Sequence, residues 1–518
     1  MQSHNRFRKE VGGAGAKDET RQGAYKSDDC VPVAPLPIVP PPTREMIEVV
    51  FEPGAVSGVE DWDFNNDKPM EEPSCHWHSE LRDILQKNNL VSWKPSFPLQ
   101  YPWSRGCSNE AAREAYRNEG RERYVTFKFS TETDVLTIAE QLRGKRGIAQ
   151  AVAVPRILPP CQPLEGGYVG TSDQVETICG TPGCLTKQWY LYRCGVPDAW
   201  KQGASGDGVV IADIDWGFDL DHPALSRTAV SQNIPRSFAD VPGTAPVVSR
   251  NVPNVADGNL LFHGNGVLGL AGATASEQGM TGIAYKATLW AIQASSGGLI
   301  DAVVDHNFWV AGIHFVRTTP ATGRKVIILE LQTAGFSNPE MIPTIALELG
   351  LAVGEGIVVC VPAGNGNPSA DAGVDDEGIA SFGDTGSIVV GATRFDSETN
   401  PRAAGTNGGS RVTVYAPGDP ESDLTCGLHG SFRDHFGGTS GATAKVAGVV
   451  ALMLEMNDKL APMDVRDILV KSTKMVCDEA ENTVGVLIDA NQAVSAAIAA
   501  RTTAAGTLPA PRMAREAA

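Results

Sequence analysis

The sequence lacks the features by which a membrane protein, a secreted protein or a nucleic-acid-binding protein is usually identified. No apolar run reaches the ~18 residues that a membrane-spanning helix needs. The first residues, MQSHNRFRKEVGGAGAKDETRQ, include no apolar segment typical of a secretory signal, which favours a cytoplasmic location or an unconventional export route. Basic residues are outnumbered, with 43 Lys and Arg against 61 Asp and Glu and a net charge of -18. Phosphate neutralisation needs cationic side chains, so we expect neither a nucleic-acid nor a membrane partner.

Cys-x-x-Cys pairs are also absent, although the chain has ten cysteines. A zinc site therefore has little support, and we expect no metal centre built on cysteine. Four cysteines crowd one stretch, namely Cys161, Cys179, Cys184 and Cys194. Reduced thiols are the first interpretation, and a disulfide within this group is the alternative.

Composition changes along the chain indicate five segments. The length allows about three domains, or one large α/β domain with appendages. The beginning is polar and then proline-rich (PVAPLPIVPPP), and the end is rich in Ala, Arg and Pro, so neither is expected to bury enough apolar surface to fold. The segments are a disordered N-terminus at 1–44, a small domain at 45–157, a linker or processing region at 158–187, a large domain at 188–501 and a loose tail at 502–518.

The large segment has the pattern of a parallel α/β sheet. Short, continuous apolar runs are typical of strands that are covered on both faces. Helical stretches such as NGVLGLAGATA lie between them, which predicts a mostly parallel sheet with helices on both faces. The expected strands are GVVIADID, ATLWAIQA, KVIILELQ, GIVVCVPAG and GSIVVGAT.

The smaller segment predicts a different architecture. Strand-like runs such as REMIEVVFEP and RYVTFKFS are each followed by a stretch with helical spacing, HSELRDILQKNNL and TDVLTIAEQLRGK. The order β-α-β, a polar insert and again β-α-β is typical of a small α+β sheet with both helices on one face, a ferredoxin-like arrangement.

Polar residues follow several of the strands expected in the large domain. Asp213 and Asp215 end one apolar run, Asn365 follows another in a Gly-flanked turn, and His263 and Ser440 each stand at the start of a small-residue helix. Functional groups gather at the carboxyl ends of parallel strands. A serine with a histidine, a carboxylate and a neutral donor is the set that acyl transfer uses.

At this point the sequence resembles the subtilases, the subtilisin-like serine peptidases. The resemblance covers about 188–500 and rests on an ordered set of motifs: QWYLYRCGVPDAW, DIDWGFDLDHPAL, HGNGVLG, PAGNGN, GSIVVGAT, VYAPGD and GTSGATAKVAG. The order Asp, His, Ser is that of the family. The element order of 45–157 is similar to that of subtilase propeptides, which act as folding templates and inhibitors.

The resemblance implies a role for each of these residues. Asp215 becomes the acid of the triad, because its spacing to HPAL matches the motif, whereas Asp213 is interpreted as a buried structural carboxylate. His263 becomes the general base, Ser440 the nucleophile and Asn365 the side-chain donor to the oxyanion. We expect Thr439 to cap the helix that carries Ser440.

Two further segments resemble the strands that flank a bound peptide in the family. The first, ASSGG, supplies Ser296, Gly297 and Gly298, and the second, LELQ, supplies Glu330 and Leu331. The family usually has Ser-Leu-Gly at the second segment. Glu330 either faces a substrate pocket, where it would favour a basic or polar residue, or is an ordinary strand carboxylate.

The chain also departs from the family pattern. HGNG replaces the usual His-Gly-Thr-His, and Lys445 stands on the serine helix, where a buried lysine needs a carboxylate partner or a depressed pKa. No cofactor is expected to be required. Calcium is common in the family, and Asp-rich loops such as ADAGVDDE are candidates without assignable ligands.

The sequence thus predicts a serine endopeptidase that is made as a self-inhibited zymogen. Its partners are expected to be a peptide or protein substrate and, in cis, its own propeptide. Two alternatives stay open: a catalytically silent, peptide-binding subtilase fold, and a dedicated processing peptidase for one partner.

Overall fold

The computed structural model describes most of the chain between residues 43 and 506. The predictions for 1–42, and most of those for the linker at 158–187, fall outside the described residues. The predicted end of the disordered N-terminus at 44 is wrong by two residues, because the first strand begins at Thr43. The longer segments left out are 57–77, 102–108, 159–167, 170–187, 235–257, 296–305, 366–383 and 395–401, besides stretches of one to five residues.

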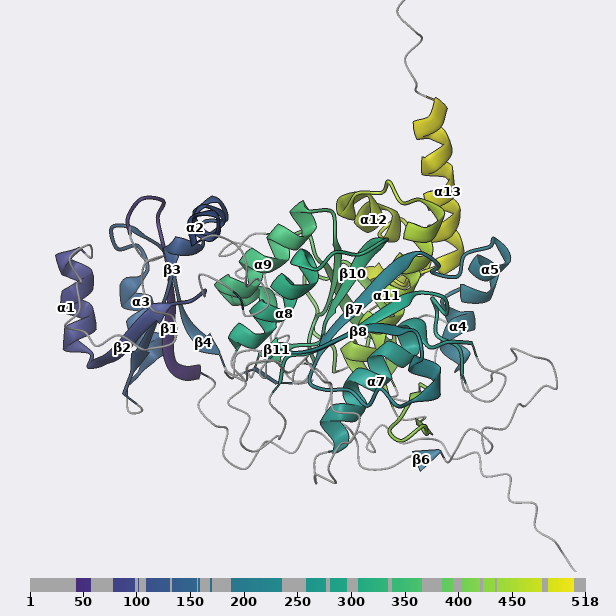
Figure 1. The fold of residues 1–518 in the computed structure, drawn as a ribbon, viewed down its shortest axis with the longest axis horizontal. Helices are drawn as coiled ribbons and strands as arrows, with labels where there is room; N and C mark the ends of the chain where they lie inside the picture. The colour runs from purple at the N-terminus through teal and green to yellow at the C-terminus, as the bar shows by residue number, and fades with distance from the viewer. Residues whose placement is uncertain are drawn as a thin grey trace, which may run out of the picture. The chain divides into compact units, whose positions relative to one another are not determined.

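Residues 43–155 contain the predicted β-α-β, insert, β-α-β order (Figure 1). The four strands form one sheet in the order β2-β3-β1-β4, and β1 pairs antiparallel with both β3 and β4. Leu81 and Leu85 of α1 and Ile138 and Leu142 of α3 are buried in its core, as their helical spacing predicts. The elements are β1 (Thr43–Phe51), α1 (Ser79–Lys87), β2 (Leu90–Pro95), α2 (Asn109–Asn118), β3 (Tyr124–Phe129), α3 (Val135–Leu142) and β4 (Ile148–Pro155), with a 3-10 turn at Arg121–Arg123.

The large domain contains a seven-stranded sheet in the order β14-β13-β12-β10-β7-β9-β8, and every neighbouring pair in it is parallel. This confirms the predicted α/β class. The five predicted strands are β7 (Val209–Asp215), β9 (Thr288–Gln293), β10 (Arg324–Leu329), β12 (Val358–Pro362) and β13 (Ile388–Arg394). The edge strands β8 (Thr228–Asn233) and β14 (Val414–Asp419) complete the sheet.

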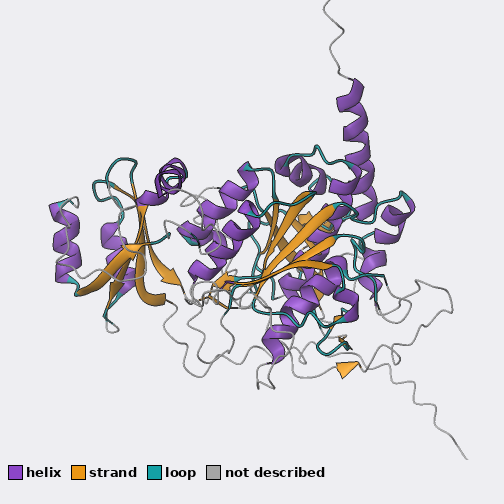
Figure 2. Cartoon of the chain, in the orientation of Figure 1, coloured by secondary structure: helices purple, strands orange, loops and turns teal. Residues whose placement is uncertain are grey.

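Helices cover both faces of this sheet (Figures 1 and 2). Side chains alternate between the faces of a strand. In β7, Val209 and Ile211 belong to the core shared with α7 and α11, whereas Val210 and Ile214 belong to the core shared with α8 and α9. The helices of the first face are α7 (Gly258–Gly272), α11 (Gly438–Met456) and α13 (Ala490–Gly506), and those of the second are α8 (His306–Thr318) and α9 (Pro343–Gly354).

Short elements complete the described chain. α13 continues to Gly506, past the boundary at 501 where the sequence predicted a loose tail. The others are α4 (Trp189–Arg193), α5 (Val196–Lys201), α12 (Pro462–Leu469), β5 (Ile157–Leu158), β6 (Tyr168–Val169), β11 (Gln332–Thr333), β15 (Thr425–Cys426), β16 (Phe432–Arg433), β17 (Met475–Cys477), β18 (Thr483–Val486) and 3-10 turns at Pro223–Leu225 and Pro339–Met341.

The described residues from 43 onward belong to one compact unit. β5, directly after the small domain, pairs antiparallel with β11 of the large domain, and Thr344 of α9 donates a hydrogen bond to Glu48 of β1 at 3.2 Å. Of the cysteines in the described part of the chain, Cys194, Cys360, Cys426 and Cys477 are free. Among the same residues, no helix is both long and apolar enough to span a membrane.

Candidate active site

The carboxyl end of β7 directs two carboxylates toward the helices α7 and α11. Asp213 and Asp215 continue the alternation of Val209 and Ile211, so they share the sheet face that these helices cover. Both side chains are completely buried. A buried carboxylate needs a hydrogen-bond partner or a proton, and the two aspartates meet this requirement differently.

Asp215 is hydrogen-bonded to His263 of α7. The imidazole Nδ1 lies 2.9 Å from Asp215 Oδ1 and 2.8 Å from Oδ2, and the backbone N–H of Trp216 donates to Oδ1 as well. On the other side of the ring, Nε2 lies 3.1 Å from Ser440 Oγ. Because the carboxylate accepts from Nδ1–H, Nε2 is the nitrogen left to accept the serine proton. The structure therefore brings Asp215, His263 and Ser440 into one hydrogen-bonded chain.

Ser440 stands in the first turn of α11, which begins at Gly438. Gly437 occupies the N-cap position, so the prediction that Thr439 caps this helix is wrong. Gly438 has φ +60, a left-handed conformation that suits glycine. In the first turn, N–H groups have no carbonyl one turn earlier to bond, so the position of Ser440 leaves its N–H without an intrahelical acceptor.

Asn365 follows β12 and holds the start of α11. Its Oδ1 accepts from the Thr439 N–H at 3.1 Å and from Thr439 Oγ1 at 3.0 Å, which explains what Thr439 does in place of capping. Its own N–H donates to Gln332 Oε1 at 2.8 Å. Since the amide oxygen is occupied, Nδ2 is the group that Asn365 can offer to a ligand beside Ser440.

Besides the two aspartates of β7, Glu330 places a carboxyl group near His263 and Ser440. It comes directly after β10, and its N–H donates to Ile214 O at 3.1 Å, beside Asp215. The side chain is completely buried, which excludes the solvent-facing alternative, while a place in a substrate pocket stays a prediction. Burial raises the pKa of Glu330 to about 8, with Asp215 adding to the shift, while His263 and the Ser440 hydroxyl oppose it.

Asp213 completes a cluster of three buried carboxyl groups. Among the described residues, no side chain or backbone group donates a hydrogen bond to either of its oxygens. Burial raises its pKa well above the usual range, and the neighbouring Asp215 and Glu330 raise it further. Asp213 is therefore a buried acid without the hydrogen bonds expected for a structural carboxylate.

The predicted peptide-binding residues have different outcomes. Ser296, Gly297 and Gly298 lie outside the described residues. The Leu331 side chain is completely buried in the core on the α8 and α9 face, so only its backbone is suited to contact a peptide. The next two residues form β11, whose antiparallel pairing places Gln332 opposite Leu158 and Thr333 opposite Ile157.

The departures from the family pattern have structural explanations. Asn265 bonds the loop that follows Asp215, accepting from the Asp219 N–H at 2.9 Å and donating to Gly427 O at 2.7 Å. The buried Lys445 has the carboxylate partner it needs, because Nζ contacts Asp423 and also donates to Pro417 O at 2.7 Å.

Sequence reasoning missed two residues that shape this site. Trp216 donates from Nε1 to Glu330 O at 3.1 Å, and the Phe436 ring lies 5.5 Å from the His263 ring. Each is next to or near a motif residue, but adjacency alone does not indicate a contact across strands or helices.

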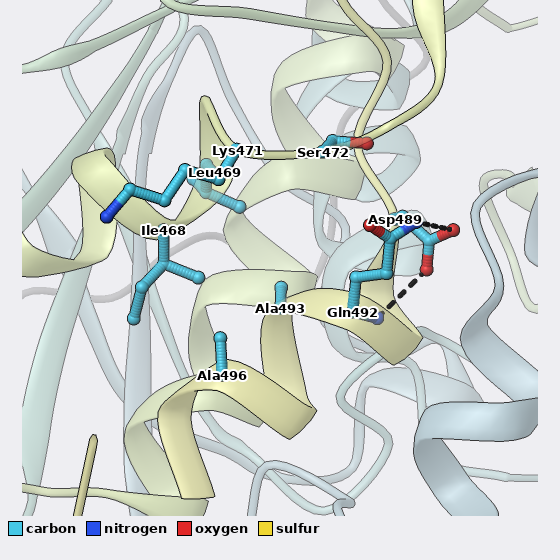
Figure 3. A pocket seen from close by; sticks show the side chains of 8 residues that line it. All are labelled: Ile468, Leu469, Lys471, Ser472, Asp489, Gln492, Ala493 and Ala496. Carbon is cyan, nitrogen blue, oxygen red and sulfur yellow. Dashed lines mark hydrogen bonds between the residues drawn. The ribbon is translucent and has the colours of Figure 1, made fainter. Parts of the chain in front are cut away.

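A hollow of about 150 Å³ lies elsewhere, between α12 and α13 (Figure 3). Its polar groups already bind one another, since Gln492 Nε2 donates to Asp489 Oδ2 at 3.0 Å and Lys474 pairs with Asp489 at 3.0 Å. None of its lining residues comes from the triad or its helices, so the candidate active site remains the hydrogen-bonded chain that ends at Ser440.

Comparisons with known proteins give a family for this chain. The model of the Subtilase family matches residues 206–486, just over half of the chain. An intracellular serine protease of Paenibacillus polymyxa is 29% identical over 264 residues, which are 50% of this chain and 70% of the relative. Subtilisin amylosacchariticus of Bacillus subtilis subsp. amylosacchariticus is 29% identical over 274 residues, 52% of this chain and 62% of the relative.

The chain thus spans less than two thirds of the length of this subtilisin. A solved structure with a similar fold is fervidolysin from Fervidobacterium pennivorans, a keratinolytic enzyme related to subtilisin. The TM-score is 0.53 at 18% identity, over 88% of this chain and 61% of fervidolysin. The family match leads to one conclusion: the chain belongs to the subtilase family.

Proposed function

We propose that the protein is a serine endopeptidase that hydrolyses peptide bonds through an acyl-enzyme on Ser440. The observation that carries the proposal is the hydrogen-bonded chain from Asp215 through His263 to Ser440, with 2.8 Å at the carboxylate end and 3.1 Å at the hydroxyl end. Distances of this size are those at which a base can take a proton from a nucleophile.

The chemistry follows from which atom of each group is free. Asp215 accepts the Nδ1–H of His263 and so holds the tautomer in which Nε2 is a base. Ser440 Oγ attacks the peptide carbonyl as its proton passes to Nε2, and the resulting imidazolium returns that proton to the leaving amine. Water then attacks the acyl-enzyme with the same base, which releases the acid product and restores the hydroxyl group.

Negative charge develops on the carbonyl oxygen during each attack. Asn365 Nδ2 and the Ser440 N–H are the two donors proposed for it, because the Asn365 oxygen is held by Thr439. The N-terminal end of α11 adds a favourable dipole at this point. Donors fixed before the reaction are worth more than water molecules that must reorient.

The substrate is proposed to bind as an added strand. β5 pairs with β11 in this way, two residues beyond Glu330, which supports a peptide path along this edge. We further propose that 45–157 is an inhibitory domain in cis and that the chain is cut somewhere between about 158 and 187. Calcium stays a proposal without assigned ligands, since the loop ADAGVDDE lies outside the described residues.

The test is Ser440→Ala in the full chain. The expected result is loss of self-cleavage, of casein turnover and of labelling by a fluorophosphonate, with intact mass and N-terminal sequencing reporting the processing site. A chain that is still cut when Ser440 is replaced would exclude self-cleavage. A wild-type protein that folds but takes no fluorophosphonate at Ser440 would favour the catalytically silent alternative, and labelling without casein turnover would favour a dedicated processing peptidase.

A further inference from the structure

The buried carboxyl group of Glu330 is not used by the mechanism above. Asp213 and Asp215 share one face of β7 beside His263, and Glu330 follows the neighbouring strand β10, where its N–H donates to Ile214 O. All three side chains are completely buried. Like charges in a water-excluded site cannot all ionise. At least one of the three acids is therefore protonated in the folded protein.

The hydrogen bonds indicate which acid is ionised. Asp215 receives the His263 Nδ1–H and the Trp216 N–H, the donors that a carboxylate needs. Among the described residues, no group forms a hydrogen bond with either oxygen of Asp213 or of Glu330. An unpaired ion in such a place would be far more costly than a neutral acid, so these two groups carry protons while Asp215 carries the charge.

The neighbours of Glu330 come from four elements. In the described part of the chain, the titratable groups that interact with it are Asp213 and Asp215 of β7, His263 of α7 and Cys360 of β12. α11 contributes the Ser440 hydroxyl. Lys445, on the same helix, forms an ion pair with Asp423. Among these neighbours of Glu330, His263 is therefore the one group that can become a cation, and it is hydrogen-bonded to Asp215.

We propose that Glu330 is a further residue of the active centre, whose neutral carboxyl group supports Ser440 and whose ionisation switches the centre off. This inference rests on the proposed serine peptidase function. A neutral acid has one O–H donor, and when it points at Ser440 Oγ the serine proton is left for His263 Nε2. The pKa of Glu330, which burial raises to about 8, places the switch in the mildly alkaline range.

Ionisation changes Glu330 from a group that can donate to Ser440 into one that can only accept. Once Glu330 has released its proton to solvent, it can only accept. The Ser440 O–H then turns toward the carboxylate and away from His263, and the new negative charge opposes the oxyanion that forms beside Ser440. Both effects slow the attack on the peptide carbonyl, and neither prevents the peptide from binding.

The test is the pH dependence of kcat/KM for the processed full-chain enzyme on a neutral peptide p-nitroanilide, from about pH 5 to about pH 10. The wild-type rate should fall about tenfold per pH unit above the midpoint, as the loss of one proton requires. Glu330→Gln cannot ionise, so whatever its rate at lower pH, its profile should lose the alkaline fall. The fall in the wild type should be in kcat, with KM unchanged. Asp467→Asn, an exposed acid on α12, is the matched control and should keep the wild-type profile.

A second measurement does not depend on turnover. In the Ser440→Ala chain at neutral pH, the infrared band of protonated carboxylic acids should lose intensity when Glu330→Gln is added. An active wild type whose alkaline fall persists in Glu330→Gln, or a band that the second substitution leaves intact, would overturn the role of Glu330 alone. If the wild type neither cleaves nor labels at Ser440, the peptidase proposal fails and this inference fails with it.

Discussion

At the residue scale, the buried lysine on the helix that carries Ser440 has a carboxylate partner. Lys445 contacts Asp423 and donates to Pro417 O at 2.7 Å, and its Nζ lies 4.9 Å from the centre of the Tyr190 ring. Burial raises the pKa of Asp423 to about 6, and Lys445 opposes that shift. The pair lets a lysine stand on the helix that carries the nucleophile.

Removing one member of this pair should be costly. Lys445→Met leaves the Asp423 carboxylate buried without its cation, and we expect a loss of about 3–5 kcal/mol in the free energy of unfolding. Urea unfolding of the full chain, with Ser440→Ala present to prevent self-cleavage, measures it. The double variant Lys445→Met, Asp423→Leu removes both charges and should recover most of the loss. Equal destabilisation of the single and double variants would argue against the pair.

Asn365 gives the second prediction at this scale. Asn365→Ala removes the amide donor, so kcat should fall by about 10²–10³-fold with KM little changed, the magnitude known for an oxyanion asparagine of subtilisin. Steady-state kinetics on a peptide p-nitroanilide reports it. Thr439→Val, which removes only the hydroxyl that binds Asn365 Oδ1, should cost much less. A similar loss in both variants would mean that Asn365 acts by holding α11 rather than by donating to the oxyanion.

At the element scale, the small domain is held against α8 and α9 by a buried ion network. Arg121 contacts Glu348 of α9, and Arg317 of α8 binds the same carboxylate at 2.7 Å and Glu119 at 2.9 Å. The ring of Tyr101 stacks on His314 at 3.9 Å. Burial alone would raise the pKa of Glu348, but Arg121, His314 and Arg317 hold it well below the usual range.

Arg121→Met should loosen this junction. Glu348 keeps Arg317, so the large domain should fold, but the small domain loses its charged contact to α9. Under the inhibitory role proposed for the small domain, we expect the processed enzyme to reach full activity sooner, because that domain dissociates faster. The lag in p-nitroanilide hydrolysis after processing measures this. Arg117→Met removes an exposed ion pair with Glu110, which is worth little, and should leave the lag unchanged. An unaltered lag in Arg121→Met would contradict an inhibitory role for this contact.

The same scale shows what the sequence could and could not predict. Continuous apolar runs identified the five central strands because both faces of each are buried. They missed the two edge strands. The residues of β8, TAVSQN, are largely polar. The strand β14 contains Pro417 and Gly418, and a proline is tolerated in a strand at the edge of a sheet. The cap at Thr439 was predicted from residue type. In the structure, the N–H and the hydroxyl group of Thr439 donate instead to Oδ1 of Asn365, which is 74 positions away.

At the scale of the whole molecule, non-local contacts assemble what local patterns cannot specify. The family resemblance selected Asp215, His263 and Ser440 correctly as neighbours, although His263 and Ser440 are separated by 177 positions. It offered no means of finding that Glu330 is buried beside them, because the family has a serine there. Nor could it predict that Val50, Phe97 and Tyr116 of the small domain enter the core cluster of α8 and α9.

The buried acids also affect the stability of the whole chain. The pKa of Glu330 is raised from 4.5 to about 8 in the folded protein, so between these values the folded state holds a proton that the unfolded state has released. Its stabilising contribution is therefore complete below about pH 4.5 and is lost as the pH rises through about 8. For one proton the slope is at most about 1.4 kcal/mol per pH unit. Urea unfolding of the Ser440→Ala chain should show this decline, and adding Glu330→Gln should flatten it. Two parallel stability curves would mean that Glu330 is already ionised in the folded state, and with it the neutral acid proposed beside Ser440 would have to be abandoned.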